Sequence, residues 1–183
     1  IGHSLALQVA ETPHPYYVIE LSSFQLDDMY DFHANIAILL NITPDHLDRY
    51  DFKFENYAAA KMRIVRNQTK ADSFIYWNDD PVIAQELSHT PVGATCYPFS
   101  ENHAENVAAY IADDTYHLAL PTPFSMPREE LSLRGKHNLY NCLAAGLAAH
   151  IAGIPDETLA KSLSNFPGVE HRLEHAGTVD GVT

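Results

Sequence analysis

Cysteine is scarce in this chain of 183 residues. Cys96 and Cys142 are its only two cysteines, and no CxxC spacing occurs. This argues against a disulfide scaffold and against a zinc site built from cysteines. Two free thiols in a reducing compartment are the remaining interpretation.

Basic side chains are few as well, 11 against 24 acidic ones, and the formal net charge is −13. An acidic surface argues against non-specific binding to nucleic acid or anionic membranes, but it leaves room for a local basic pocket for a phosphorylated ligand. The sequence also lacks a signal peptide and an apolar run long enough to cross a bilayer. We therefore expect no nucleic-acid partner, no membrane insertion and a cytoplasmic location.

An initiator methionine is missing too, because the chain begins IGHSLA and its first methionine is Met29. The last residues, LEHAGTVDGVT, resemble the opening of a new strand. We interpret the chain as a piece of a longer polypeptide. Its length still suffices for one domain with a sizeable core.

Short runs of β-forming residues alternate with helical patterns in the first part of the chain. Strands alternating with helices predict βαβ units, and runs that are apolar on both faces are typical of a parallel sheet. The predicted strands are 16–21, 36–42 and 73–78, and the predicted helices are 4–10 and 56–68. The fold class expected is α/β, a mostly parallel sheet flanked by helices.

The middle of the chain has a different pattern. AAYIADDTYHLALP, residues 108–121, predicts an antiparallel hairpin around an Asp-Asp-Thr turn, and 129–135 predicts a third strand. We expect these strands to form a small antiparallel layer beside the main sheet. Helical spacing returns over 139–151 and again over 157–166, before a Pro/Gly break at 166–172.

Glu20 stands at the end of the predicted strand 16–21 and is followed by Ser22 and Ser23. A carboxylate in an apolar strand is costly unless it is paired or bound to a metal. Polar groups at the carboxyl end of a parallel strand usually face a ligand crevice. The alternative is an exposed glutamate at a strand end.

His46 lies in the loop that follows the second predicted strand, NITPDHLDRY, which should open onto the same crevice. With Asp45 and Asp48 on either side, His46 could bind a metal or a phosphate. The alternative is a solvated loop histidine, one of eleven in the chain.

Lys61 is spaced to share an otherwise apolar helix face with Tyr57, Ile64 and Val65. Its stem could simply cover apolar surface while the ammonium reaches water. Alternatively, desolvation lowers the pKa of the amine, and a neutral amine can react with carbon dioxide to give a carbamate. A carbamate is an anionic oxygen ligand suited to Mg²⁺, so Glu20 and His46 with a carbamylated Lys61 would make a magnesium site.

The segment GKHN, 135–138, is not a Walker motif, because Glu130 stands where the first glycine is required. It is better interpreted as a helix start. Asn138 and Asn141 would share one helix face and could bond to a base or a phosphate, or Asn138 could only cap the helix. Arg172 could reach a nucleotide or lie on the surface.

Five segments, in their order and approximate spacing, resemble the Mur ligases: VIELSSFQLD, NITPDHLDRY, AAKMRI, GKHNLYNCLAA and FPGVEHRLE. The resemblance runs from about residue 15 to the end and is interrupted at about 78–130. Each segment alone is a weak signal, and the five together are a strong one. The string ELSSFQL resembles the branch of the family that adds D-glutamate to UDP-N-acetylmuramoyl-L-alanine.

The resemblance implies a Mur ligase central domain of the P-loop NTPase type and roles for three residues in metal binding. Lys61 matches the family's carbamylated lysine, which helps to hold a second Mg²⁺, and His46 matches another ligand of that ion. Glu20 matches the ligand of the Mg²⁺ that bridges the phosphates of ATP.

The same resemblance implies that Ser22 lines the muramoyl-peptide site and that Asn141 and Arg172 contact the nucleotide. ATP and Mg²⁺ are the implied cofactors. The implied reaction is ATP-dependent amide formation through an acyl phosphate, which D-glutamate then attacks.

The family's glycine-rich ATP loop is expected upstream of Ile1. We therefore expect residues 1–172 to be a central ATPase domain without its phosphate loop, and 173–183 to begin the C-terminal ligase domain. The piece alone is expected to be inactive, and its free sheet edges to promote self-association. The complete ligase is expected to be a monomer.

Three alternatives stay open at this point. The first is a sister ligase, such as folylpolyglutamate synthase or a lysine- or diaminopimelate-adding Mur ligase, against which Ser-Ser-Phe-Gln argues. The second is a non-catalytic binding module of the same fold, against which the retention of Glu20, His46 and Lys61 argues. The third is a histidine-rich metallohydrolase, which no HExxH cluster supports.

Overall fold

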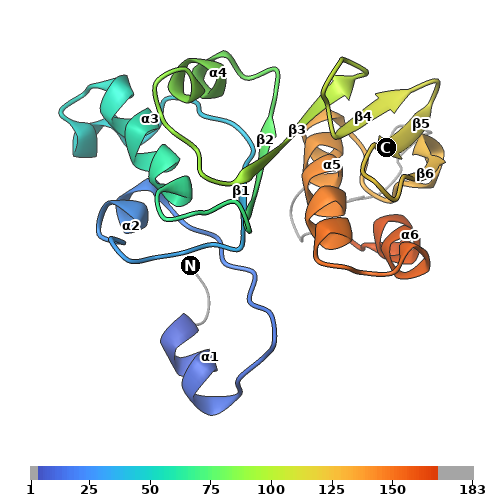
Figure 1. Ribbon diagram of the computed structural model, residues 1–183, viewed down its shortest axis with the longest axis horizontal. Coiled ribbons are helices and arrows are strands. Elements are labelled where there is room, and N and C mark those ends of the chain that lie inside the picture. The colour runs from blue at the N-terminus through green and yellow to red at the C-terminus, as the bar shows by residue number, and fades with distance from the viewer. Residues whose placement is uncertain (1–3, 169–183) are drawn as a thin grey trace, which may run out of the picture.

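A single mixed sheet organises the part of the chain that the computed structural model describes, residues 4–168. Its six strands lie side by side in chain order (Figure 1). They are β1 (Ile36–Leu39), β2 (Ser73–Trp77), β3 (Thr95–Asn102), β4 (Ala109–Ala112), β5 (Thr115–Leu118) and β6 (Phe124–Pro127). The α/β prediction is confirmed.

Strands β1 to β4 pair in parallel, and β4 to β6 pair antiparallel. The predicted hairpin is confirmed as β4 and β5, whose turn places Asp113 and Asp114 at φ 47° and 53°. The antiparallel strands extend the main sheet instead of forming a layer beside it. They do so because β4 pairs with β3 along one edge and with β5 along the other.

Side-chain alternation along β2 divides the core into two layers. Phe74 and Tyr76 face one layer, which also holds the apolar side of α3 (Phe54–Met62) and α4 (Pro81–Leu87). Ile75 and Trp77 face the other layer, packed against α5 (Lys136–Ile151). A central strand therefore needs apolar residues on both faces, as its sequence SFIYW provides.

The predicted helices are confirmed with shifted ends. The remaining helices are α1 (Leu5–Glu11), α2 (Ser23–Asp27) and α6 (Asp156–Asn165), with 3₁₀ turns at Leu47–Tyr50, Arg63–Val65 and Arg128–Glu130. The long helix α5 forms because Leu139, Leu143 and Leu147 repeat every four residues and are all buried against the sheet.

Two strand predictions were wrong. Residues 16–21 are irregular and exposed apart from half-buried Leu21, since no segment between 4 and 168 pairs with them in a ladder. Residues 129–135 are not a strand either; the third antiparallel strand is β6, just before them. In β6, Phe124 and Met126 alternate inward, whereas residues 129 and 130 belong to the 3₁₀ turn Arg128–Glu130 and 131–135 are irregular.

Strand β3 was not predicted. Its sequence, TCYPFSEN, contains a proline and ends in three polar residues, which is atypical of a central strand. It pairs with β2 and β4 on its two sides. Pairing on both edges outweighs its low intrinsic strand propensity.

Helix α1 stands apart from the sheet and buries none of its residues (Figure 1). No helix between residues 4 and 168 is both long enough and apolar enough to cross a bilayer. Arg172 and the predicted segment 173–183 lie outside the described residues, as does most of the predicted break at 166–172.

Candidate functional site

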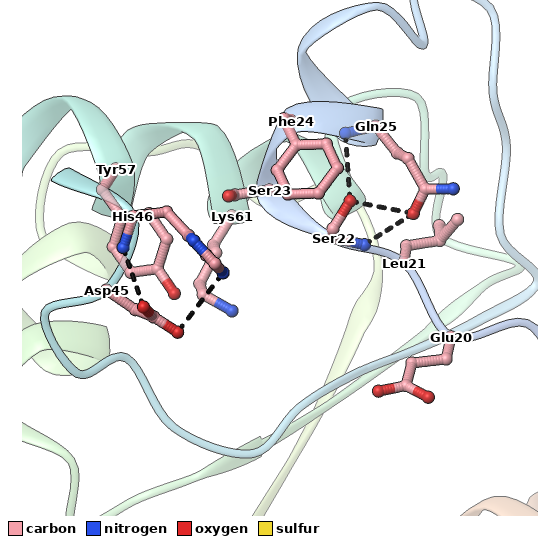
Figure 2. A pocket seen from close by; sticks show the side chains of 10 residues that line it. All are labelled: Glu20, Leu21, Ser22, Ser23, Phe24, Gln25, Asp45, His46, Tyr57 and Lys61. Atoms are coloured by element: carbon pink, nitrogen blue, oxygen red, sulfur yellow. Dashed lines mark hydrogen bonds and ion pairs between the residues drawn. The ribbon is translucent and has the colours of Figure 1, made fainter. Parts of the chain in front are cut away.

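A pocket of about 270 Å³ opens where α2 and the segment before it, the loop after β1 and helix α3 meet (Figure 2). Four of the six predicted site residues line it. Its lining residues are Glu20, Leu21, Ser22, Ser23, Phe24, Gln25, Asp45, His46, Tyr57 and Lys61. The pocket therefore joins three segments that are well separated in the sequence.

Ser22 caps the short helix α2 and fixes one wall of the pocket. The Ser22 hydroxyl accepts the backbone N–H of Gln25 at 3.3 Å, and the Gln25 carboxamide oxygen accepts the N–H of Ser22 at 2.9 Å. This reciprocal capping box satisfies two backbone donors that the helix start leaves open. The Ser22 hydroxyl also donates to Gln25 Oε1 at 2.9 Å, so the two side chains hold each other at the pocket rim.

Arg63 holds α2 against α3. Its guanidinium donates to the backbone carbonyls of Leu26 and Asp27, both at 2.8 Å. The hydroxyl of Tyr50 donates to the Asp27 carboxylate at 3.0 Å. These bonds satisfy carbonyls at the end of α2, so the pocket wall carrying Ser22 has a fixed position relative to the helix carrying Lys61.

His46 occupies a left-handed backbone conformation, φ 48° and ψ 33°, just after β1 and before the 3₁₀ turn Leu47–Tyr50. Asp45 Oδ1 accepts the backbone N–H of His46 at 2.8 Å, and Asp45 Oδ2 lies 3.5 Å from His46 Nε2. The imidazole meets the Phe24 ring edge to face at 6.0 Å between centroids. A left-handed non-glycine residue costs free energy and is a frequent feature of functional sites.

Lys61 is half-buried on α3, and its Nζ lies 5.2 Å from the centroid of the Tyr57 ring. Burial lowers the pKa of Lys61 below its ordinary value, and the negative charge of Asp45 opposes this shift as the smaller effect. Burial also raises the pKa of Tyr57. The shared helix face predicted for Lys61 and Tyr57 is present, and the ammonium is partly desolvated there.

Glu20 lies across the pocket from His46 and Lys61, on the irregular segment that leads into α2 (Figure 2). Its side chain is exposed, and it is not at a strand end as predicted. Among residues 4–168, no three His, Cys, Asp or Glu side chains form a metal-binding group on their own. A magnesium site here would need an anionic oxygen ligand from another residue, which a carbamate on Lys61 would supply.

Asn141 is exposed on α5 and does not line the pocket. Helix α5 packs on the opposite face of the sheet from α3. Its first residue, Lys136, pairs with Glu101 near the end of β3 at 3.1 Å, which brings the start of the helix to the carboxyl edge of the parallel strands. The structure does not bring Asn141 together with Glu20, Ser22, His46 and Lys61.

No role was assigned from the sequence to four residues that line the pocket, Leu21, Phe24, Gln25 and Tyr57. Tyr57 could have been selected because it stands one helical turn before Lys61. Gln25 could have been selected from its capping-box spacing to Ser22. For Phe24 the sequence carries no signal, since its ring meets His46 only in the folded chain.

Residues 1–149 match the model of the Mur ligase middle domain. The chain belongs to the Mur ligase family. The matched range includes Glu20, Ser22, His46, Lys61 and Asn141.

Relatives with high identity carry one name. The UDP-N-acetylmuramoylalanine--D-glutamate ligase of Bacteroides thetaiotaomicron is 57% identical over 182 residues, and that of Porphyromonas gingivalis is 53% identical over 185. Each alignment covers 100% of this chain and 41% of the relative. The chain thus spans about two fifths of the length of these ligases.

Solved structures of the family share the fold at low identity. A murein peptide ligase from Psychrobacter arcticus gives a TM-score of 0.59 at 21% identity, over 78% of this chain and 29% of that one. The MurF ligase from Thermotoga maritima, determined in complex with ADP, gives 0.50 at 18% identity, over 74% and 31%. The mixed sheet with helices on both faces is therefore the family's central-domain fold.

Proposed function

We propose that the chain is the central part of a ligase that adds D-glutamate to UDP-N-acetylmuramoyl-L-alanine at the expense of ATP. The observation that carries this proposal is the meeting of Glu20, His46 and Lys61 in one pocket, although 15 residues separate the last two and 26 the first two. The names of the relatives supply the substrates, and the family supplies the chemistry.

Lys61 is proposed to carry a carbamate and, with His46, to hold one Mg²⁺, while Glu20 holds another. The donor set fits, because the partly desolvated amine of Lys61 has a lowered pKa and a neutral amine reacts with carbon dioxide. Mg²⁺ would neutralise charge on the phosphates and on the attacking carboxylate.

The reaction has two steps in this proposal. An oxygen of the substrate carboxylate bonds to the γ-phosphorus of ATP and the bond to ADP breaks, which gives an acyl phosphate. The amine of D-glutamate then bonds to the acyl carbon, phosphate leaves, and the nitrogen loses its proton. The pocket rim around Ser22 and Phe24 would orient the muramoyl substrate. Orientation of bound reactants lowers the barrier, because the reacting groups no longer have to meet by collision.

Residues 1–172 are proposed to be the central ATPase domain and 173–183 to open a C-terminal domain. Asn141 and Arg172 are proposed to contact the nucleotide, since Lys136 brings the start of α5 to the carboxyl edge of the sheet. The related MurF ligase was determined in complex with ADP, which supports nucleotide binding in this family. The complete ligase is proposed to act as a monomer.

The test follows phosphate release by the complete ligase with ATP, Mg²⁺ and UDP-N-acetylmuramoyl-L-alanine. D-Glutamate, L-glutamate, L-lysine and diaminopimelate are offered separately to the wild type, to Lys61→Ala and to Lys61→Arg. Loss of a preorganised charged group typically lowers the turnover number about 10²–10³-fold. We expect turnover with D-glutamate, loss in both variants, and partial recovery of Lys61→Ala with short carboxylic acids.

Each other outcome has a definite meaning. Turnover with a different amino acid would assign the chain to a sister ligase. Full activity of Lys61→Arg would reject the carbamate, because a guanidinium cannot form one. Absence of turnover with all four amino acids would reject the ligase and favour a binding module.

A further inference from the structure

Asp80 is a buried carboxylate outside the pocket that makes three hydrogen bonds to backbone N–H groups. Its Oδ1 accepts from Val82 and Ile83 at 2.8 and 3.0 Å, which caps the start of α4. Its Oδ2 accepts from Ile42 at 3.0 Å. The side chain is 4% exposed, so both oxygens are removed from water and depend on these donors.

Ile42 belongs to the loop that leaves β1 and reaches Asp45 and His46. The bond to Asp80 therefore joins the loop of the pocket to the connection between β2 and α4. Strands β1 and β2 are parallel neighbours, so their carboxyl ends lie side by side and a single carboxylate can span them. Ile42 is itself buried with Ile83, but apolar packing does not fix the direction of a loop as a hydrogen bond does.

The bond between Ile42 and Asp80 matters for the backbone conformation of His46. Its left-handed backbone is unfavourable for a side chain with a Cβ and persists only where the surrounding contacts over-determine it. On the C-terminal side of His46, the 3₁₀ turn Leu47–Tyr50 fixes the backbone. The Asp45 carboxylate accepts the backbone N–H of His46. Four residues before His46, the hydrogen bond from the Ile42 N–H to Asp80 fixes the first part of the loop.

We propose that Asp80 is a positioning residue for His46: it anchors the loop after β1 to the start of α4 and so sets the imidazole in the pocket. The consequence for cation binding rests on the proposed function. Asp80 does not line the pocket and is not a ligand in this proposal. Partners that orient metal ligands typically affect metal affinity about 10–100-fold.

The neighbouring residue, Asp79, provides a matched control. Asp79 Oδ2 accepts from the Ser100 hydroxyl at 2.6 Å and from the Trp77 indole N–H at 3.2 Å. It therefore joins β2 to β3, on the side away from the His46 loop. Asp79→Asn changes the same chemical group one residue away without touching Ile42.

The test uses the complete ligase as wild type, Asp80→Ser and Asp79→Asn. Serine still caps a helix but is too short to span to Ile42, so α4 is preserved. Hydrogen–deuterium exchange should become about tenfold faster or more for the amides between Ile42 and His46 in Asp80→Ser, as expected for a lost charge-assisted bond. Val82 and Ile83 should stay protected, and Asp79→Asn should behave as wild type over 42–46.

The second readout is the Mg²⁺ concentration that gives half-maximal turnover, which should rise about tenfold or more in Asp80→Ser only. Unchanged exchange over 42–46 would overturn the proposal, and so would equal loosening by Asp79→Asn. Faster exchange with an unchanged Mg²⁺ requirement would reduce Asp80 to a structural anchor and also overturn it. If the wild type shows no Mg²⁺-dependent turnover, the proposed function fails, while exchange still decides whether Asp80 positions the loop.

Discussion

The hydroxyl of Tyr116 lies directly over Gly146. Tyr116, on β5, is fully buried and donates its hydroxyl to the Cys142 carbonyl of α5 at 3.2 Å. A Cβ added at residue 146 would overlap the hydroxyl oxygen and lie 3.0 Å from Tyr116 Cζ. The absence of a side chain at Gly146 therefore allows α5 to pack closely on the antiparallel part of the sheet.

Gly146→Ala should destabilise the protein by about 1–3 kcal/mol, despite the better helix propensity of alanine, because it overpacks a rigid contact. Urea unfolding measures the change in the free energy of unfolding. Adding Tyr116→Phe removes the overlapping oxygen, so the double variant should be less destabilised than the sum of the two single variants. Additive effects would show that the overlap does not determine the cost.

Gln68→Met should also destabilise the protein. The Gln68 carboxamide donates to the carbonyls of Ala34 and Ser73, both at 2.9 Å, and so joins the segment before β1 to β2. Methionine has a similar volume but no donor, and the loss of bonds to buried carbonyls should cost about 1–3 kcal/mol. Thermal unfolding is the measurement, and exposed Gln85→Met on α4, with an expected change within about 0.5 kcal/mol, is the control. Equal shifts in both variants would contradict the prediction.

Asp72 should make stability depend on acid pH. The hydrogen bond with His33, followed by the backbone N–H of Thr69, lowers the pKa of Asp72 from 3.8 to about 2. A lowered folded-state pKa stabilises the protein above the unfolded value, and this contribution is lost as the pH falls through the folded value. The stability difference between wild type and Asp72→Asn should therefore be full above about pH 4 and vanish towards pH 2.

Urea unfolding of both proteins between pH 2 and pH 6, an interval of about two units on each side of the ordinary carboxyl pKa, measures this difference. Of the donors to Asp72, Thr69→Ala removes the hydroxyl alone and leaves the backbone N–H, so it should show a smaller effect in the same pH window. A difference that stays constant with pH would refute the assignment.

The amine of Lys61 should become reactive towards acylation at a lower pH than the amine of an exposed lysine. Burial lowers the pKa of Lys61, so its neutral, nucleophilic form should appear earlier as the pH rises. Competitive labelling with acetic anhydride in carbon-dioxide-free buffer, read by mass spectrometry, compares Lys61 with exposed Lys70 in the same sample. Identical labelling profiles would mean that the ammonium of Lys61 is solvated and would remove the support for a carbamate.

Local sequence patterns were sufficient wherever an element depends on its own residues. The four-residue repeat of Leu139, Leu143 and Leu147 predicted α5, and the Asp113–Asp114 turn predicted the β4–β5 hairpin. The apolar run SFIYW predicted a strand, which is β2. Lys61 stood out because a cation interrupts an apolar helix face, and the structure has it half-buried there.

Tertiary structure decided what depends on partners distant in the sequence. Residues 16–21 have strand-forming side chains but no ladder partner between residues 4 and 168, whereas β3 has weak propensity and pairs on both edges. The left-handed backbone of His46 and the bond from Ile42 to Asp80 exist only once β1 and β2 lie side by side. The sequence by itself determined helices α1, α3, α5 and α6, strands β1 and β2, the β4–β5 hairpin and which residues carry reactive groups, since these follow from local periodicity and side-chain chemistry. Only the fold decided which of those groups share a pocket, because long-range packing and hydrogen bonding set the distances between them.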